Sequence, residues 1–250
     1  MAQTKTKGTK EKMIRYIFFA ICQLFCVGSL VYFSVTGTLS QALICALSVG
    51  CLCLPDLAER LFKMKIGLPM YLFVLAYAVC PTLGHAYKFY YLIPWWDTLL
   101  HTVGGVVFAV LGAYLPKIIL KKEDVSVLLC ALTGLLFSVF VAVVWEIIEY
   151  TADSLFFTDM QQDTFVHSIY SYLIGDKLGE IGAIGGITSV TVNGVTLDAY
   201  IDVGLIDTMT DVIFETLGAL AYAVVYLIDK GKRVSIKYIN RKENETPTSS

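Results

Sequence analysis

The sequence predicts an all-α integral membrane protein with six transmembrane helices and a long external loop that contains a small β-hairpin. Of its 250 residues, 56% are hydrophobic and only 16% are charged, whereas about a quarter of the residues in a soluble domain are charged. The apolar residues also gather in continuous runs, and a bilayer span requires roughly 17–25 such residues. Together these observations exclude an ordinary soluble domain.

Six apolar runs along the chain are separated by short polar segments, which favours antiparallel packing of consecutive helices. The second and third runs are the shortest. The predicted spans are Ile14–Val35, Leu39–Leu54, Leu68–Leu83, Trp96–Leu115, Ser126–Tyr150 and Thr208–Ile228.

Three further segments surround or interrupt this six-helix domain of residues 14–228. Residues 1–13 form a basic N-terminus, and residues 229–250 form a basic tail whose end is disordered by composition. The external loop, residues 151–206, lies between the fifth and sixth helices. Its stretch "ITSVTVNGVTLDAYI" alternates β-branched residues around Asn193-Gly194, which predicts a hairpin with a type I′ turn.

The basic residues predict the orientation of the chain. If the N-terminus is cytoplasmic, only Lys88 and Lys177 of the 19 lysines and arginines fall on the external side. Basic residues are concentrated in cytoplasmic segments of membrane proteins. The sequence therefore predicts a multi-pass protein of the plasma (inner) membrane with both termini in the cytoplasm.

Ionisable residues interrupt the apolar runs of three helices. Asp97 and His101 lie one turn apart at the start of the fourth span. Glu146 and Glu149 lie at the end of the fifth span. The sixth span begins with acidic residues four positions apart, so that they share one helix face; these are Asp207, Asp211 and Glu215.

The alternating direction of the spans places all three groups at the outer end of the bundle. Each lies within a few turns of the membrane surface, at about 1.5 Å of depth per residue. Ionisable side chains are costly in hydrocarbon and usually serve a function there. Glycines near these groups, which allow close approach between helices, are Gly104, Gly105, Gly112 and Gly218.

Several explanations of this cluster remain open. A divalent metal ion would offset the carboxylate charge, with ligands from Asp97, His101, Glu146, Glu149, Asp207 and Asp211. Alternatively, protonated acids form a proton or ion pathway, or a purely structural network. Glu215 and His85 are additional candidates.

The first functional hypothesis is a metal-dependent membrane enzyme acting on a lipid or cell-envelope substrate, with Glu146 and Glu149 as its catalytic residues. One alternative is a cation- or proton-coupled transporter, which is favoured by Glu215 because this acid lies deeper in the predicted span than the others. The other is a non-catalytic membrane accessory protein. The lipid bilayer is the expected partner. Phosphate-binding and hydrolase motifs are missing from the sequence, and nothing in it supports nucleic-acid binding.

Four stretches resemble the YjdF-like family of bacterial inner-membrane proteins. They are "WWDTLLHTVGG", "VVWEIIEYTAD", "DMQQDT" and "GLIDTMTDVIFETLGAL". The resemblance covers roughly Trp95 to Ile228 and implies a polytopic plasma-membrane protein, without indicating a substrate. The recurring positions that it implies are Asp97, His101, Trp145, Glu146, Glu149, Asp207, Thr208 and Asp211.

Overall fold

The computed structural model describes residues 2–61, 64–231 and 236–238. Within this part of the chain, six helical segments are long and apolar enough to cross a membrane, which confirms the predicted fold class. Several extend beyond the predicted limits by one or more turns. The six segments are Thr9–Thr36, Leu39–Leu61, Leu68–Ala86, Trp96–Leu120, Val127–Phe156 and Leu205–Ile228.

The chain forms two compact units. Unit 1 comprises Met1–Ala142 and Ile213–Ser250, and unit 2 comprises Val143–Val212. Helices α7 (Val127–Phe156) and α8 (Leu205–Ile228) each contribute residues to both units.

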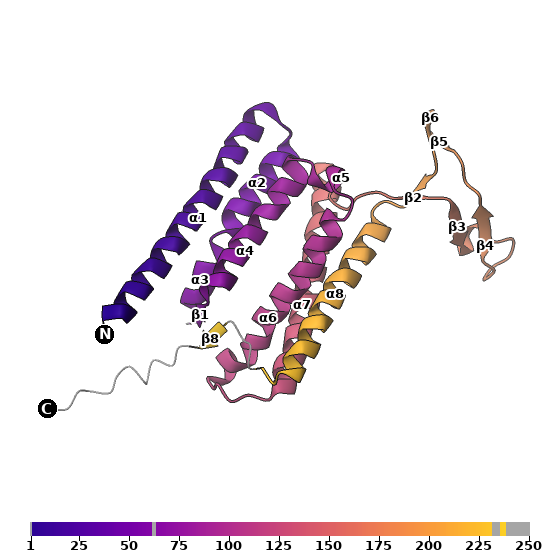
Figure 1. Cartoon of the computed structure of the whole chain (residues 1–250). Helices are drawn as coiled ribbons and strands as arrows, with labels where there is room; N and C mark the ends of the chain where they lie inside the picture. The colour runs from indigo at the N-terminus through magenta and orange to yellow at the C-terminus, as the bar shows by residue number, and fades with distance from the viewer. Residues whose placement is uncertain (1, 62–63, 232–235, 239–250) are drawn as a thin grey trace. The chain divides into compact units, whose positions relative to one another are not determined.

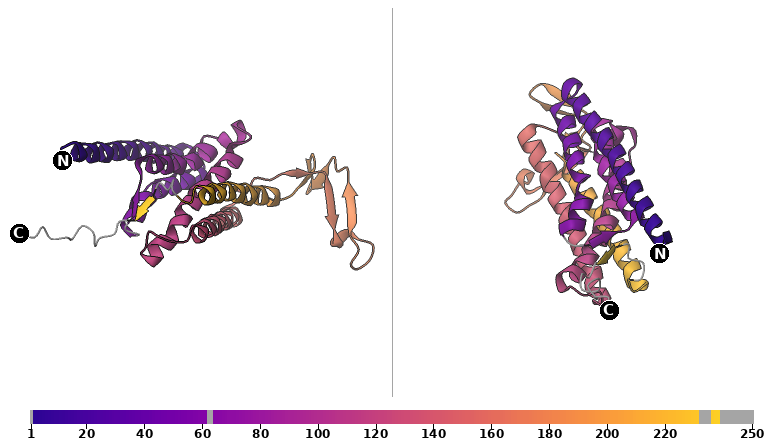
Figure 2. Two further views of the ribbon diagram at one scale, coloured as in Figure 1. Left: turned by 60° about the horizontal axis from the view of Figure 1, so that its bottom comes forward. Right: turned by 90° about the vertical axis from the view of Figure 1, so that its left-hand side faces the viewer.

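The helices of unit 1 that precede α7 pack as neighbours along the chain. In Figures 1 and 2, α1, α2 and α4 lie side by side, and each of these three helices contacts the other two. A short π-helix, η1, directly continues α4. The bounds are α1 Ala2–Thr36, α2 Leu39–Cys51, α3 Leu54–Leu61, α4 Leu68–Pro81, η1 Thr82–Ala86, α5 Phe89–Leu92 and α6 Trp96–Leu120.

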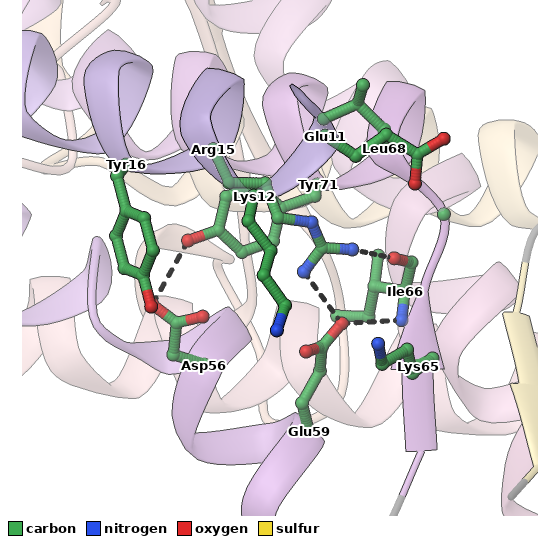
Figure 3. A pocket seen from close by; sticks show the side chains of 11 residues that line it. Glu11, Lys12, Arg15, Tyr16, Asp56, Glu59, Lys65, Ile66, Leu68 and Tyr71 are labelled. Carbon is green, nitrogen blue, oxygen red and sulfur yellow. Dashed lines mark hydrogen bonds and ion pairs between the residues drawn. The ribbon is translucent and has the colours of Figure 1, made fainter. Parts of the chain in front are cut away.

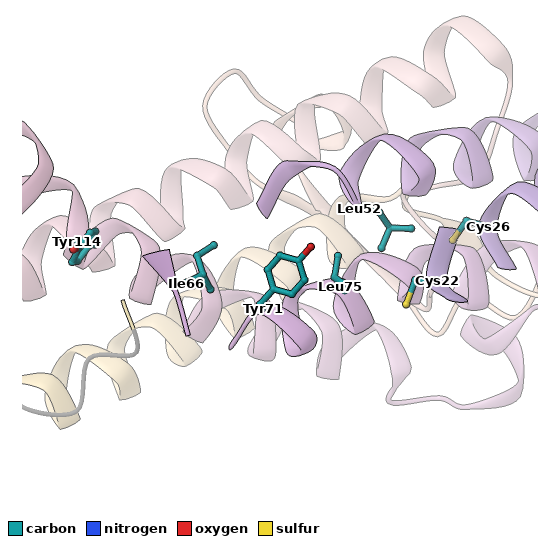
Figure 4. Close-up of a cluster of buried hydrophobic side chains, with 7 residues drawn as sticks. All are labelled: Cys22, Cys26, Leu52, Ile66, Tyr71, Leu75 and Tyr114. Carbon is teal, nitrogen blue, oxygen red and sulfur yellow. The ribbon is translucent and has the colours of Figure 1, made fainter. Parts of the chain in front are cut away.

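Local sequence signals explain where two of these helices begin. Thr38 caps α2 through a reciprocal capping box with Gln41, an arrangement that satisfies backbone donors at a helix start. Pro69 lies in the first turn of α4, which begins after Gly67, and the missing N–H of a proline costs nothing there. Inside the bundle, a buried cluster joins α1, α4 and α6 (Figure 4); its members are Cys22, Cys26, Leu52, Ile66, Tyr71, Leu75 and Tyr114.

A short strand pair joins two distant parts of unit 1. Strand β1 (Met64–Ile66) pairs antiparallel with β8 (Ile236–Tyr238). Strand β8 therefore lies beside the residues that lead into α4. The predicted tail did not include a strand here. The end predicted to be disordered, "RKENETPTSS" at residues 241–250, lies outside the described residues.

Unit 2 contains small antiparallel strand pairs between α7 and α8. The pairs are β2 with β7, β3 with β4 and β5 with β6. Asn193 and Gly194, between β5 and β6, have φ angles of 48° and 86°, as a type I′ turn requires. The hairpin is therefore confirmed. The bounds are β2 Phe165–Val166, β3 Ser168–Ser171, η2 Tyr172–Ile174, β4 Gly182–Gly185, β5 Val190–Val192, β6 Val195–Leu197 and β7 Tyr200–Ile201.

The connection between α7 and α8 is shorter than the sequence suggested. Helix α7 continues to Phe156 and α8 begins at Leu205, so the connection spans 157–204. The stretch "TADSLF" at the end of α7 contains neither proline nor glycine to end the helix. Gly204, with a φ of +79°, directly precedes α8, and glycine adopts this conformation without strain.

Candidate functional site

In unit 1, glycines bring α6 and α8 into backbone contact. A Cβ atom at Gly105 would collide with the carbonyl oxygen of Glu215 and lie 2.9 Å from the nitrogen of Ala219. A Cβ atom at Gly218 would likewise collide with the carbonyl oxygen of Thr102. Only glycine permits such an approach, so the prediction of close helix contacts at these glycines is confirmed.

This approach places a histidine beside a buried acid. His101, on α6, is 8% exposed, and Glu215, on α8, is 3% exposed. The imidazole Nδ1 lies 3.5 Å from Glu215 Oε2, while Nε2 lies 3.7 Å from Asp97 Oδ1. One imidazole therefore faces a carboxylate on each side, and such a ring can accept a proton from one acid and release it toward the other.

A serine from α7 extends this arrangement. The Ser138 hydroxyl, which is fully buried, lies 3.4 Å from Glu215 Oε1 and donates to the carbonyl oxygen of Gly105 at 3.1 Å. Sequence reasoning missed Ser138. Its signal is a single hydroxyl within the apolar stretch "LLFSVFVAVV".

A tyrosine from α4 supports α6 near the histidine. The Tyr77 hydroxyl donates to the carbonyl oxygen of Leu100 at 2.9 Å. Its oxygen also lies 2.5 Å from where a Cβ of Gly104 would be, so a larger residue at position 104 would displace the phenol. Tyr77 was also missed from sequence, because nothing in its local pattern sets it apart from the other tyrosines.

In unit 2, three buried carboxylates meet. Glu146 and Glu149, on α7, are 6% and 7% exposed, and Asp211, on α8, is 2% exposed. Each offers one carboxylate oxygen, and these oxygens lie within 4.8 Å of one another. Two oxygens on opposite sides of a metal ion that binds each at about 2.4 Å would be about 4.8 Å apart. The three side chains are thus spaced so that they could hold an ion.

Glu149 is oriented by its neighbour on the same helix. The indole Nε1 of Trp145, one turn earlier, donates to Glu149 Oε1 at 2.8 Å. A hydrogen bond of this kind restricts the rotation of a ligand and tunes its basicity. The tryptophan of "WEIIE" therefore contacts one of the three carboxylates.

The segment that follows α7 is attached to the end of that helix. Asp153 accepts hydrogen bonds from the Thr158 hydroxyl at 2.5 Å and from the backbone N–H groups of Met160 at 2.7 Å and Gln161 at 2.9 Å. The backbone turns back at Phe157, whose φ is 54°. One carboxylate therefore organises the first turn after the helix.

The same segment is also attached to the start of α8. The backbone N–H of Gln162 donates to Asp207 Oδ2 at 2.9 Å, and the Gln161 amide donates to the Thr208 hydroxyl. These are the glutamines of "DMQQDT", whose local pattern did not predict a contact with "DTMTD". Asp207 thus accepts a hydrogen bond from a backbone N–H of unit 2. It does not belong to the group formed by Glu146, Glu149 and Asp211.

Replacing Asp153 by alanine is expected to release the segment 157–164. Three donors would lose their acceptor, and leaving a partly buried donor unsatisfied costs about 1–3 kcal/mol. Hydrogen–deuterium exchange should show faster exchange at the N–H groups of Met160 and Gln161. The matched control is Asp198→Asn, which changes an exposed acid in the same unit; equal protection in Asp153→Ala and the control would contradict the assignment.

Acidic residues within this segment repel one another. The pKa of Asp159 is raised by partial desolvation and by the nearby carboxylates of Asp163 and Asp153. The pKa of Asp163 is also raised, by partial desolvation and then by Asp202 and Asp153. Since a raised pKa means that the ionised form is disfavoured, this part of unit 2 gains stability when these acids are protonated.

The remaining sequence candidates are placed as follows. Asp97 and His101 lie together in unit 1 with Glu215, which the sequence had named only as an additional candidate. His85 lies half-buried in η1. Lys177 could have offset the charge of the buried acids, but its Nζ lies 3.6 Å from Glu180 Oε1 in the segment between α7 and α8.

The fold and these groups define a class: a six-helix membrane protein with buried acidic residues and a histidine in its later helices. The chain belongs to the family DUF2238, described as "Predicted membrane protein", which matches residues 17–231. This confirms the resemblance seen in the sequence. No curated protein and no solved structure matches the chain.

Proposed function

We propose that this protein is a metal-dependent membrane enzyme that acts on a lipid or cell-envelope substrate. One observation carries the proposal: the carboxylate oxygens of Glu146, Glu149 and Asp211 lie within 4.8 Å of one another and are buried. Buried polar groups at membrane depth are usually retained for function.

The donor set favours a hard divalent cation. Carboxylate oxygens suit Mg²⁺, Mn²⁺ and Ca²⁺, all of which accept further ligands from water or substrate. Lys177, the only lysine or arginine between residues 143 and 212, lies beside Glu180. Basic side chains within unit 2 therefore offset little of the negative charge of the three carboxylates. A bound cation would offset this charge directly.

Each residue has a role in this proposal. Glu146, Glu149 and Asp211 hold the ion, which when bound would polarise a substrate oxygen or acidify water. Trp145 holds one oxygen of Glu149, so that its other oxygen is directed for binding the ion or for accepting a proton. As ligands, Asp97, His101 and Asp207 stay predictions from the sequence.

Metal binding by the purified protein tests the site. We expect Mg²⁺ or Mn²⁺ to raise the unfolding temperature, because a ligand at a hundred times its Kd stabilises the folded state by about 2.7 kcal/mol. The double variant Glu146→Gln/Asp211→Asn should abolish this rise. Metal content measured on the same samples should fall in parallel.

The exposed residue Asp198 provides the control for a nonspecific loss of negative charge. Asp198→Asn removes one negative charge from unit 2 without touching the three carboxylates, so it should retain the full metal-dependent shift. If the wild-type protein shows no shift with any divalent ion, the enzyme proposal is overturned and a non-catalytic accessory role becomes the better account.

A second candidate, a proton- or cation-coupled transporter, is favoured by the histidine of unit 1. His101 faces Glu215 and Asp97, and the Ser138 hydroxyl lies beside Glu215. Such a chain of exchangeable protons resembles the relays found in transporters. Proton or cation flux into liposomes that is lost in Glu215→Gln, but kept in the exposed control Glu123→Gln, would favour this candidate over the enzyme.

The proposed orientation in the plasma membrane has both termini in the cytoplasm and the acidic groups toward the exterior. The bias of lysine and arginine supports it. The pairing of β1 with β8 also supports it, since it holds β8 beside the residues that lead into α4. Cysteine labelling from outside the cell, after introduction of a cysteine at Asp198, provides a direct test.

A further inference from the structure

A pocket of about 420 Å³ lies in unit 1 and is shown from close by in Figure 3. The start of α1, the end of α3 and the segment leading into α4 surround it. These are the ends of three segments that are long and apolar enough to cross a membrane, a position that would place the pocket near the level of the lipid head groups. Its volume is within the range of small-molecule sites.

Part of the pocket wall is held rigid by an ion pair. Arg15 lies 2.9 Å from Glu59 Oε1 and also donates to the carbonyl oxygen of Ile66. The same Glu59 oxygen accepts from the backbone N–H of Ile66 at 2.7 Å. In addition, the Arg15 guanidinium lies 4.3 Å from the ring centre of Tyr71. The charge of Arg15 is therefore used to join α1, α3 and the start of α4.

Two further basic residues, Lys12 and Lys65, also line the pocket. Lys12 and Lys65 are both exposed, and Figure 3 shows their side chains in the pocket with Glu59 between them in the view. Neither forms an ion pair with any residue that the structure describes. Two ammonium groups are thus available at one pocket, where a phosphate would be bound by both.

Acidic residues complete the lining. Glu11 lies next to Lys12 in sequence and lines the same pocket, as does Asp56, which accepts a hydrogen bond from the Tyr71 hydroxyl at 3.0 Å. A ligand with negative charge alone would meet these carboxylates as well as the lysines. A zwitterion would place each of its charges against the opposite sign.

We propose that this pocket binds a zwitterionic head group, with its phosphate at Lys12 and Lys65 and its primary amine at Asp56. The chemistry is that of phosphoethanolamine, which occurs both as a lipid head group and as a free ester. The position of the pocket at the ends of membrane spans allows the acyl chains of a lipid to remain in the bilayer.

Lipid binding to the full-length protein in detergent tests the proposal by native mass spectrometry. The probes are phosphatidylethanolamine, phosphatidylcholine and phosphatidylglycerol with identical acyl chains. We expect phosphatidylethanolamine to bind most tightly, because phosphatidylcholine has no N–H donor and phosphatidylglycerol has no amine. Lys12→Met/Lys65→Met should weaken this binding by about thirtyfold, since each basic residue contributes about 1 kcal/mol near a lipid surface and about 1.4 kcal/mol corresponds to a factor of ten.

The matched control is Lys121→Met/Lys122→Met, which removes two exposed lysines outside the pocket and should leave binding unchanged. Equal loss in both double variants, or no preference among the three lipids, would overturn the proposal. Because all four lysines are exposed, each variant should keep the unfolding temperature of the wild type. Competition by free phosphoethanolamine would identify a soluble ester as the ligand, and its failure to compete would identify the lipid. In both cases the binding should depend on Lys12 and Lys65.

Discussion

Replacing Glu215 by alanine is expected to destabilise the folded protein by about 1–3 kcal/mol, the cost of leaving a buried polar partner without its acceptor. His101 Nδ1 would lose the carboxylate that lies 3.5 Å away, and the buried Ser138 hydroxyl would lose a neighbouring acceptor. The measurement is thermal or denaturant unfolding in detergent. Glu215→Gln, which keeps the shape and an acceptor oxygen, should cost clearly less.

A double-mutant cycle with His101→Ala separates the pair from its surroundings. If the histidine and the acid interact, the loss in the double variant will be smaller than the sum of the single losses, by about 0.5–3 kcal/mol. Additive losses would show that each side chain is held by other groups and would remove the proton-exchange role. The acid and the histidine come from helices far apart in sequence, so this coupling also reports on the packing of α6 against α8.

Gly105→Ala is the second substitution with a large expected effect. The added methyl group would meet the carbonyl oxygen of Glu215 and the nitrogen of Ala219. These are backbone atoms, which cannot turn aside as a flexible side chain can. Overpacking of this kind costs about 1–3 kcal/mol, and the separation of α6 from α8 should also weaken the contact between His101 and Glu215. Unfolding temperature and cysteine cross-linking between the two helices would measure both effects.

Gly28→Ala is the matched control, because a Cβ at Gly28 in α1 has no atom within 4 Å. Alanine is favoured over glycine inside a helix by about 1 kcal/mol, so this variant should be neutral or slightly more stable. If Gly105→Ala behaves in the same way, close contact between α6 and α8 is not what stabilises this part of the protein.

Much of the fold follows from patterns that act over short distances. The apolar runs set the six spans, and Asn193-Gly194 set the hairpin, because both depend on residues that are neighbours in sequence. The ends of helices were less predictable. Helix α7 continues to Phe156 beyond the apolar run, since no proline or glycine follows that run to end the helix.

The candidate residues were predictable one by one, whereas their partners were not. Glu146 and Glu149 stand out as acids in an apolar helix, yet their meeting with Asp211 depends on how α7 and α8 are rotated about their own axes. Asp207 resembles Asp211 in sequence, but a backbone N–H from Gln162 reaches it, and such a contact has no local pattern.

The sequence by itself determined that this is a six-span membrane protein with acidic residues and a histidine at defined helix positions, because hydrophobic runs and their interruptions are local properties. Only the tertiary structure decided which of these residues meet, that Glu215 faces His101, and that Lys12 and Lys65 line one pocket. The physical reason is that helix rotation and approach are decided by packing, and here by the absence of a Cβ at Gly105 and Gly218.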